Sequence, residues 1–170
     1  RLLSLLLAVA MMVAILPTAA FADDEASTVN SDLRINANGI PYNVSDDTQN
    51  QSNESVSGNG WKYTHETNSS WLDLGVDSAN YNFDLSDQPT LSCEVELYSG
   101  TISGGTFNEK ISVPYSATDA CTISGGVFHG PIYFSGSNSN SSASLKVTGG
   151  IFIDSDNGFY GQTSRITIEG

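Results

Sequence analysis

A seven-residue motif that recurs along the chain most constrains its fold. Thr-Ile-Ser-Gly-Gly-Thr-Phe at 101–107 is repeated with few changes at 122–128 and 146–152, and a fourth copy opens at 167–170. The β-branched residues that open the copies are spaced by 21, 24 and 21 residues, at Ile102, Ile123, Val147 and Ile168. Self-similarity at about 20–30 residues is typical of a solenoid, in which each repeat forms one turn and adjacent turns share a core.

The motif itself is typical of a bent strand. The residues on either side of the glycine pair favour extended backbone, whereas two adjacent glycines permit a tight bend. If the turns stack in register about 4.8 Å apart, the β-branched residues form one interior column, and Phe107, Phe128 and Phe152 form a second. The residues that follow the first column then face outward as a row of mostly hydroxyl groups: Ser103, Ser124, Thr148 and Glu169.

These features predict an all-β chain whose repeats form a parallel β-solenoid. The alternatives are a flat antiparallel sheet of hairpins and a Gly/Ser-rich linker, but a linker would not place Phe at the same offset three times. After residue 22, no stretch has helical periodicity long enough to predict a helix. Because the fourth copy stops at its first glycine, we expect a C-terminally truncated solenoid that continues beyond residue 170.

Residues 1–22 have the pattern of a secretory signal peptide. An apolar run from Leu2 to Leu16 follows Arg1, and Ala20-Phe21-Ala22 supplies an A-x-A cleavage pattern before an acidic segment. The run falls short of the ~20 apolar residues needed to span a bilayer, so an uncleaved anchor is the weaker alternative. We expect a secreted or cell-surface protein that meets the membrane only during export.

The charge balance excludes one class of partner. The chain has 19 acidic and 6 basic residues and a net charge of −13. Such a surface repels nucleic acid and anionic lipid, and no Lys/Arg patch opposes that repulsion. We therefore expect no binding to nucleic acid. The same charge favours solubility, and it is also compatible with the collection of Ca²⁺.

The segment before the repeats divides into two parts. Residues 23–60 are predicted to hold a β-hairpin, which alternates around an Asn-Gly turn at 33–44, followed by a polar linker at 45–60. Residues 61–100 are rich in alternating apolar and polar positions and are predicted to form a β-rich cap. A cap is expected because a bare first turn would expose an unpaired strand edge. The solenoid is then expected over 101–170.

Two tryptophans and two cysteines allow more than one interpretation. Trp61 and Trp71 are expected to be buried in the cap, with a sugar-stacking platform as the alternative. Cys93 and Cys121 have only one possible internal pairing, which in a secreted chain would be a disulfide between the cap and the repeats. Two unpaired small residues in the core are an equally good interpretation.

No motif for catalysis or tight metal binding is present. Asp154-x-Asp156-Asn157-Gly158 partly resembles a calcium-binding loop, but its ligand spacing departs from that of an EF-hand. An Asn-Gly turn explains the segment equally well. Neither His65 nor His129 has partners at a catalytic spacing. We expect no catalytic residue and no cofactor, with Ca²⁺ at Asp154 and Asp156 as a weak alternative.

The repeats resemble those of a known group of proteins. Ile-Ser-Gly-Gly-Thr-Phe and Ile-Ser-Gly-Gly-Val-Phe are similar to the Gly-Gly-x-Phe repeats of secreted bacterial surface proteins. The resemblance implies a right-handed β-helix of the pectate-lyase-like kind. The segment 60–74 is similar to the one that leads into such repeats in carbohydrate-binding-domain-containing proteins, so the resemblance covers roughly residues 33–170. Pectate lyases use acidic calcium ligands with a basic residue, and the bases in these turns, Lys110, Lys146 and Arg165, match no such motif.

The sequence therefore predicts a binding or display role on the cell surface, with adhesion or polysaccharide binding as its form. The expected binding groups are the outward hydroxyls Ser103, Ser124 and Thr148, together with Trp61 and Trp71 if these are exposed. Hydroxyls without an activating base do not cleave sugars, so we expect modest affinity and no turnover. The alternatives are a polysaccharide lyase or glycoside hydrolase with its active turns beyond residue 170, and a structural spacer.

Overall fold

The computed structural model describes residues 28–29, 32–45, 55–77, 80–135, 142–153, 158–161 and 165–169. All 18 elements in this part of the chain are β-strands, which confirms the predicted all-β class. No helix among these residues is long and apolar enough to cross a membrane. The predicted signal peptide at 1–22 lies outside the described residues.

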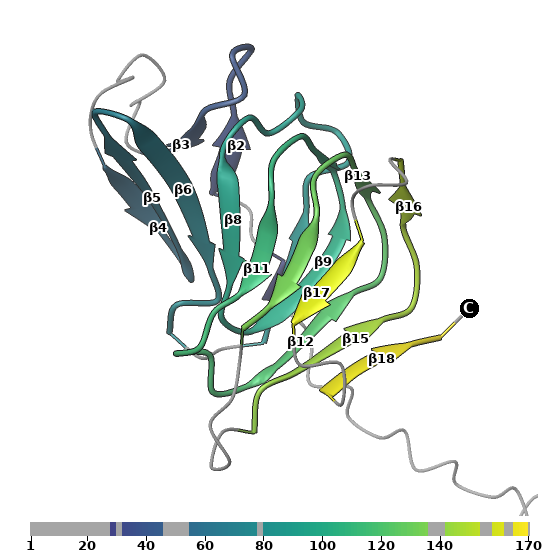
Figure 1. Ribbon diagram of the computed structural model, residues 1–170. Helices are drawn as coiled ribbons and strands as arrows, with labels where there is room; N and C mark the ends of the chain where they lie inside the picture. The colour runs from purple at the N-terminus through teal and green to yellow at the C-terminus, as the bar shows by residue number, and fades with distance from the viewer. Residues whose placement is uncertain are drawn as a thin grey trace, which may run out of the picture.

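The chain winds as a parallel β-solenoid of three sheets, seen in Figure 1 as successive arrows that follow the same path. A seven-stranded sheet has the order β17-β14-β11-β8-β6-β5-β4, and a three-stranded sheet has the order β10-β13-β16. A six-stranded sheet has the order β1-β7-β9-β12-β15-β18, in which β1 is Thr28–Val29. The strands of the turns are β6 (Ser69–Leu74), β7 (Tyr81–Asp84), β8 (Glu94–Leu97), β9 (Gly100–Gly104), β10 (Thr106–Phe107), β11 (Ile111–Val113), β12 (Ala120–Ile123), β13 (Val127–Phe128), β14 (Ile132–Phe134), β15 (Ser144–Val147), β16 (Ile151–Phe152), β17 (Phe159–Gly161) and β18 (Ile166–Ile168).

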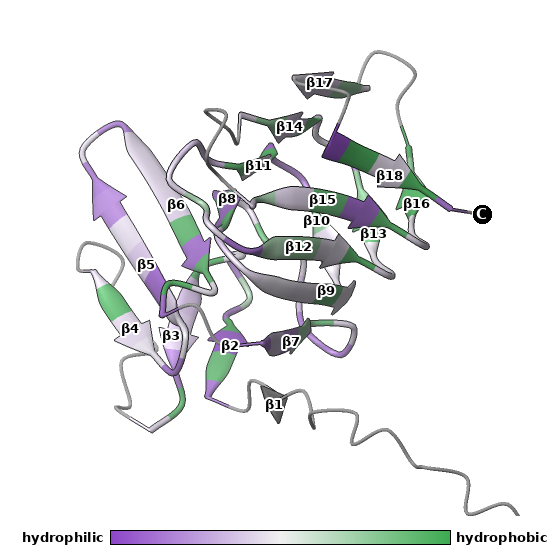
Figure 2. Ribbon diagram, turned by 90° about the horizontal axis from the view of Figure 1, so that it is seen from below, coloured by the Kyte–Doolittle hydropathy of each residue, from purple (hydrophilic) through white to green (hydrophobic). Residues whose placement is uncertain are grey.

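The predicted interior columns are confirmed. Strands β9, β12, β15 and β18 lie one above another in Figure 2, with Ile102, Ile123, Val147 and Ile168 in register. The first three of these side chains are buried, whereas Ile168, on the outermost strand, is 62% exposed. The Phe107, Phe128 and Phe152 rings stack with centroids 5.1 and 5.0 Å apart. The inner turns therefore bury their apolar residues against the same residues of the next turn, whereas Phe152, like Ile168, is partly open to solvent at 38% exposure.

The glycine pairs let the turns approach each other at the bend. The second glycine of each complete motif has a positive φ, 120° at Gly105, 112° at Gly126 and 114° at Gly150, which side chains other than glycine rarely adopt. The first glycine of the second copy has a different role, because a Cβ on Gly125 would lie 2.2 Å from the carbonyl oxygen of Ser103 in the turn below. The bend thus requires glycine for conformation and for space.

The segment before the repeats confirms one prediction and corrects two. The predicted hairpin is present as β2 (Leu33–Ile35) and β3 (Pro41–Asn43), paired antiparallel, with Gly39 at φ 80° in its turn. The predicted linker is wrong at its C-terminal end, because Val56–Gly58 forms β4 and pairs antiparallel with β5 (Trp61–Glu66). Pairing with the long strand β5 satisfies backbone groups that a free polar segment would leave to water.

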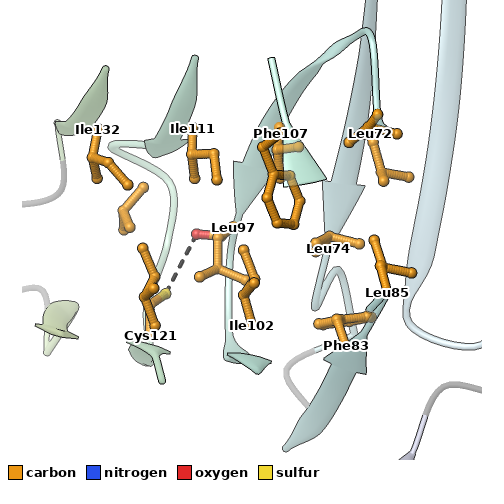
Figure 3. Packing of buried hydrophobic residues seen from close by; sticks show 14 of the residues in the cluster. Leu72, Leu74, Phe83, Leu85, Leu97, Ile102, Phe107, Ile111, Cys121 and Ile132 are labelled. Atoms are coloured by element: carbon orange, nitrogen blue, oxygen red, sulfur yellow. Dashed lines mark hydrogen bonds between the residues drawn. The ribbon is translucent and has the colours of Figure 1, made fainter. Parts of the chain in front are cut away.

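The coil also starts earlier than the predicted boundary at residue 101. Strand β6 pairs parallel with β8, and β7 pairs parallel with β9, so residues from 69 onward already follow the path of the later turns. Leu91 extends the third side of this turn through a parallel bridge to Phe107. The boundary was misplaced because this turn lacks the Gly-Gly motif. Its strands join the same core, in which Leu72, Leu74 and Phe83 are buried (Figure 3).

Substitution of Gly125 by alanine should test the close approach at the bend. The new Cβ would push against the Ser103 carbonyl, so we expect the free energy of unfolding to fall by about 1–3 kcal/mol. Chemical denaturation followed by circular dichroism would measure this change. Gly158→Ala is the matched control, because nothing lies within 4 Å of a Cβ there. An equal loss in both variants would contradict a specific contact at Gly125.

Candidate functional site

The predicted hydroxyl row is present on the outside of the coil. The backbone N–H groups of Ser124 and Thr148 each donate to the carbonyl of the column residue one turn below, both at 2.8 Å. Ser124 and Thr148 are exposed and Ser103 is half-buried. The Ser103 hydroxyl oxygen has no hydrogen-bond partner, and the Ser124 hydroxyl lies 3.5 Å from the Ile102 carbonyl. The register therefore brings together three residues that the repeat pattern predicted.

A shallow groove of about 430 Å³ runs beside this row, along the bends of three successive turns. It exists because the glycine pairs leave no side chains at the bends. Its lining is Ser86, Ser103, Gly104, Gly105, Thr106, Gly125, Gly126, Val127, Gly150 and Ile151. No Asp, Glu, His, Lys or Arg is among these lining residues, so the groove offers hydroxyl and backbone groups but no acid or base. This lining suits weak hydrogen bonding.

The sugar-platform interpretation is wrong for Trp61. Its side chain is fully buried, and its Nε1–H donates to Asp32 Oδ1 at 2.9 Å. The second oxygen of Asp32 accepts from the backbone N–H of Asn59 at 3.0 Å. Trp61 faces inward because its strand alternates, with Trp61 and Tyr63 inside and Lys62 outside. The expected burial of Trp61 in the segment before the repeats is therefore confirmed, and the alternative is not.

Trp71 differs from Trp61. It is half-buried and lies in register with Glu94, next to Leu72, which faces the core. Because side chains alternate along a strand, Trp71 belongs to the outer face of the seven-stranded sheet. This face was not singled out by the sequence motifs, yet it carries aromatic and carboxylic side chains that are described next.

An ordered row of side chains crosses that outer face. The strand registers place one outward residue from each of six strands, β5 to β17 of this sheet, in line parallel to the solenoid axis: Lys62, Asp73, Glu96, Ser112, Tyr133 and Tyr160. We call these six residues the outer row. A signal was present in the sequence, because Ser112 and Tyr133 each lie between two apolar residues at the same offset from a motif phenylalanine. The outer-row side chains differ in type from turn to turn, so they do not appear as a repeated motif in the sequence.

A hollow of about 420 Å³ opens in the middle of the outer row. Ser112 is 7% exposed, and its short side chain lies between the longer Glu96 and Tyr133. Lys110, Pro114, Tyr115 and Ser135 complete the lining. The hollow follows directly from the one small residue in a row of large ones. It is bordered on one side by a carboxylate and on the other by an aromatic ring.

The aromatic side of the hollow is built on two stacked tyrosines. The Tyr133 and Tyr160 rings have centroids 4.9 Å apart and an interplanar angle of 19°. Tyr115, which also lines the hollow, is 58% exposed. Because the strands of a sheet fix the ring positions, this surface is preorganised and loses little side-chain freedom when a ligand binds.

A buried carboxyl lies next to the acidic side of the hollow, on the strand beyond Glu96. Asp73 is 9% exposed, and its Oδ1 atom has no hydrogen-bond partner. Burial raises the pKa of this carboxyl to about 6 and the charge of Glu96 adds to the shift, while Lys62 and a hydrogen bond with Trp71 oppose it. Its neighbour Glu96 accepts a hydrogen bond from the Tyr98 hydroxyl at 2.9 Å. Burial and that carboxylate together raise the pKa of Tyr98 to about 12.

Of the two interpretations of the cysteines, the structure supports the unpaired one: Cys93 and Cys121 are both free and buried. Cys121 lies in register with Gly100, so strand β8 separates it from Cys93. Four strand residues span about 13 Å, whereas bridged cysteines need Cα atoms within about 7 Å. The Cys121 thiol donates instead to the Leu97 carbonyl at 3.4 Å (Figure 3). Burial is the main cause that raises the pKa of each thiol to about 12.

The weak calcium candidates cannot be placed, because Asp154 and Asp156 lie outside the described residues. Within the described ranges, no group of three or more His, Cys, Asp or Glu side chains is arranged to hold a metal ion.

Of the two histidines, His65 borders another hollow, of about 460 Å³, with Cys93, Glu94 and Glu109. The raised pKa of the Cys93 thiol keeps it protonated and a poor nucleophile.

Comparisons with known proteins add no name to this arrangement: no family model, no curated protein and no solved structure matches the chain. The function must therefore be inferred from the geometry of the outer row and of the glycine groove. Of these two surfaces, the outer row has the greater chemical variety, because it combines aromatic rings, carboxylates and the Ser112 hydroxyl.

Substitution of Asp73 by asparagine should reveal the cost of its buried charge. The pKa of this carboxyl is raised from 3.8 to about 6 in the folded protein, so the folded state binds the proton more tightly than the unfolded state. Stability from this group is therefore complete below about pH 4 and is lost as the pH rises through 6. We expect Asp73→Asn to gain about 1–2 kcal/mol relative to the parent chain between pH 4 and pH 8.

Urea titrations of both chains at pH 4, 6 and 8 would measure this difference. Asp87→Asn, which removes an exposed carboxyl, is the control and should show no such pH dependence. A pH-independent difference between Asp73→Asn and the parent chain would show that the carboxyl does not titrate as described.

Proposed function

We propose that this β-solenoid is a non-catalytic protein of the cell surface or the extracellular medium, and that it binds polysaccharide through the outer row. The observation that carries the proposal is the stacked pair Tyr133 and Tyr160 beside the hollow over Ser112. The pair offers flat apolar surface, and the hollow offers hydrogen-bonding groups next to it. A few polar groups placed around an aromatic surface are typical of small-molecule sites.

The direction of the outer row favours a polymer as the ligand. Its residues follow one another from strand to strand, about 4.8 Å apart along the axis. An extended chain of sugar rings that lies along this axis meets a new side chain at every turn. The glycine groove with Ser103, Ser124 and Thr148 runs in the same direction along the neighbouring bends. It provides a second and weaker surface, because hydroxyls alone give little affinity.

One arrangement favours the rival function, which is glycoside hydrolysis. Asp73 and Glu96 are neighbouring carboxylic side chains, and the pKa of Asp73 is raised to about 6, as in a general acid. The burial of Asp73 argues against this role, because its Oδ1 atom is inaccessible to a glycosidic oxygen. Glu96 in turn is held by the Tyr98 hydroxyl. We therefore propose binding without turnover.

Substitution of Tyr133 by alanine should remove most of the binding. The variant loses one ring of the stack and one wall of the hollow, so we expect an affinity for polysaccharide about tenfold lower or weaker. Binding to insoluble polysaccharides and titration with soluble oligosaccharides would measure the change. Tyr42→Ala, which removes a tyrosine from the separate β2–β3 hairpin, is the matched control.

The alanine triple variant at Ser103, Ser124 and Thr148 separates the two surfaces. We expect it to bind nearly as well as the parent chain, because the hydroxyl row contributes only weakly. If the triple variant loses binding and Tyr133→Ala retains it, the glycine groove is the site and the outer row is not. Reproducible release of sugar products from a polysaccharide panel, abolished by Asp73→Asn or Glu96→Gln, would establish the enzyme instead.

The proposed location outside the cell follows from residues 1–22. Expression in a secreting host should give a chain that begins at Asp23, because Ala20-Phe21-Ala22 fits the cleavage pattern. Mass spectrometry of the intact exported protein would identify its first residue. A chain that retains the apolar segment and sediments with membranes would support the anchor and contradict cleavage.

A further inference from the structure

The two charged residues that line the hollow differ in whether they have an ion pair. Lys110 forms a salt bridge with Glu94, with 2.7 Å between Nζ and Oε2. The carboxylate of Glu96, which lines the hollow, has a hydrogen bond from the neutral Tyr98 hydroxyl. Glu96 forms no salt bridge within the described residues. The hollow therefore has one carboxylate, Glu96, without an ion pair among the described residues, while its one lysine, Lys110, is paired with Glu94.

The carboxyl next to Glu96 has an unmet hydrogen-bond acceptor. Asp73 lies in register with Glu96 on the neighbouring strand, and its side chain is 91% buried. Its Oδ1 atom has no partner. Buried polar atoms in proteins are almost always hydrogen-bonded, and each exception requires an explanation. Because this oxygen is buried, no ligand in the hollow contacts it directly, and its effect on the hollow passes through the charge of the neighbouring Glu96.

The shape of the hollow sets the distance between this acidic end and the aromatic end. Glu96, Ser112 and Tyr133 are consecutive members of the outer row, so about two strand spacings, or roughly 10 Å, separate the first from the third. One sugar ring that lies over Ser112 can therefore stack near Tyr133 and direct a substituent toward Glu96. The ligand must combine an apolar ring face with a positively charged donor.

We propose that the outer row recognises a saccharide with free, protonated amino groups, whose ammonium group lies against Glu96 beside Asp73 while its ring packs on Tyr133. This inference rests on the proposed function and names the ligand class of the same site. A polymer of glucosamine-type sugars has this chemistry. Anionic polysaccharides are disfavoured by the net charge of −13, and neutral ones leave the acidic end without a cation.

Recognition of an amine has a consequence for protons. The groups that face Asp73 are Lys62 from β5, Glu96 and Tyr98 from the β8 side, and Trp71 from its own strand. Burial is the main cause that raises the pKa of Asp73, and the negative charge of Glu96 adds to it. An ammonium group beside the pair offsets the contribution of Glu96. Binding near pH 6 should therefore release protons from Asp73, as linkage requires.

Isothermal titration of the purified chain with two probes of equal length tests the proposal. The probes are a β-linked glucosamine hexamer and its fully N-acetylated counterpart, in which each ammonium group is replaced by a neutral acetamido group. At pH 6 we expect the glucosamine hexamer to bind roughly tenfold more tightly. Titration of the parent chain and of Asp73→Asn in two buffers of different ionisation enthalpy separates protons released by Asp73 from protons taken up by the glucosamine amines, and the parent chain should release more.

Two substitutions locate the contact. Glu96→Gln should lower the affinity for the glucosamine hexamer by roughly tenfold, while the affinity for the N-acetylated hexamer changes by less than about twofold. Asp87→Asn also removes one negative charge, but from an exposed turn that is not part of the outer row. This control should leave both affinities as they are.

The outcomes distinguish this inference from the proposed function. Equal affinity for both probes, weakened by Tyr133→Ala, would overturn the amine inference and leave the polysaccharide site in place. If neither probe binds, or if Tyr133→Ala has no effect on either, the proposed function fails as well. Displacement of the glucosamine hexamer by equimolar hexalysine would show that the site reads positive charge in a peptide, and would also overturn the saccharide inference.

Discussion

The whole structure depends on the close, in-register stacking of one turn on the next at the glycine bends. Gly125 lies so near the Ser103 carbonyl that even a methyl group would collide with it. This approach allows the backbone N–H of Ser124 to reach the Ile102 carbonyl at 2.8 Å and the motif phenylalanines to stack about 5 Å apart. A single contact type, repeated at each turn, thus sets the spacing of the hydrogen bonds and of the core.

The same stacking determines the functional surface. Once the interior columns are in register, every residue between two interior positions is placed in an outward row, whatever its chemical type. Ser112 and Tyr133 owe their adjacency to the buried pairs around them, Ile111 with Ile132 and Val113 with Phe134. The scaffold therefore holds aromatic rings and carboxylates at fixed separations without any contact between their own side chains being needed.

The acidic end of the outer row has an energetic cost for the scaffold. Asp73 is buried beside another carboxylate, and its raised pKa expresses that cost at neutral pH. A fully apolar or hydroxyl side chain at this position would make a more stable sheet. Polar groups that destabilise a fold are expected at binding sites, which is why this pair, rather than the well-satisfied Asp32 beneath Trp61, supports a functional argument.

The sequence by itself determined the solenoid, because the motif fixes the period, the bend and both interior columns, and it determined the hydroxyl row of Ser103, Ser124 and Thr148. It misplaced the start of the coil, since the turn through β6 and β7 has no glycine pair to mark it. It left Cys93 and Cys121 undecided, because pairing depends on separation in space. Only the tertiary structure assembled the outer row, because this row depends on which strands are neighbours and on which face each residue lies. A repeat search finds residues that stay the same from turn to turn, whereas this site is built from residues that change.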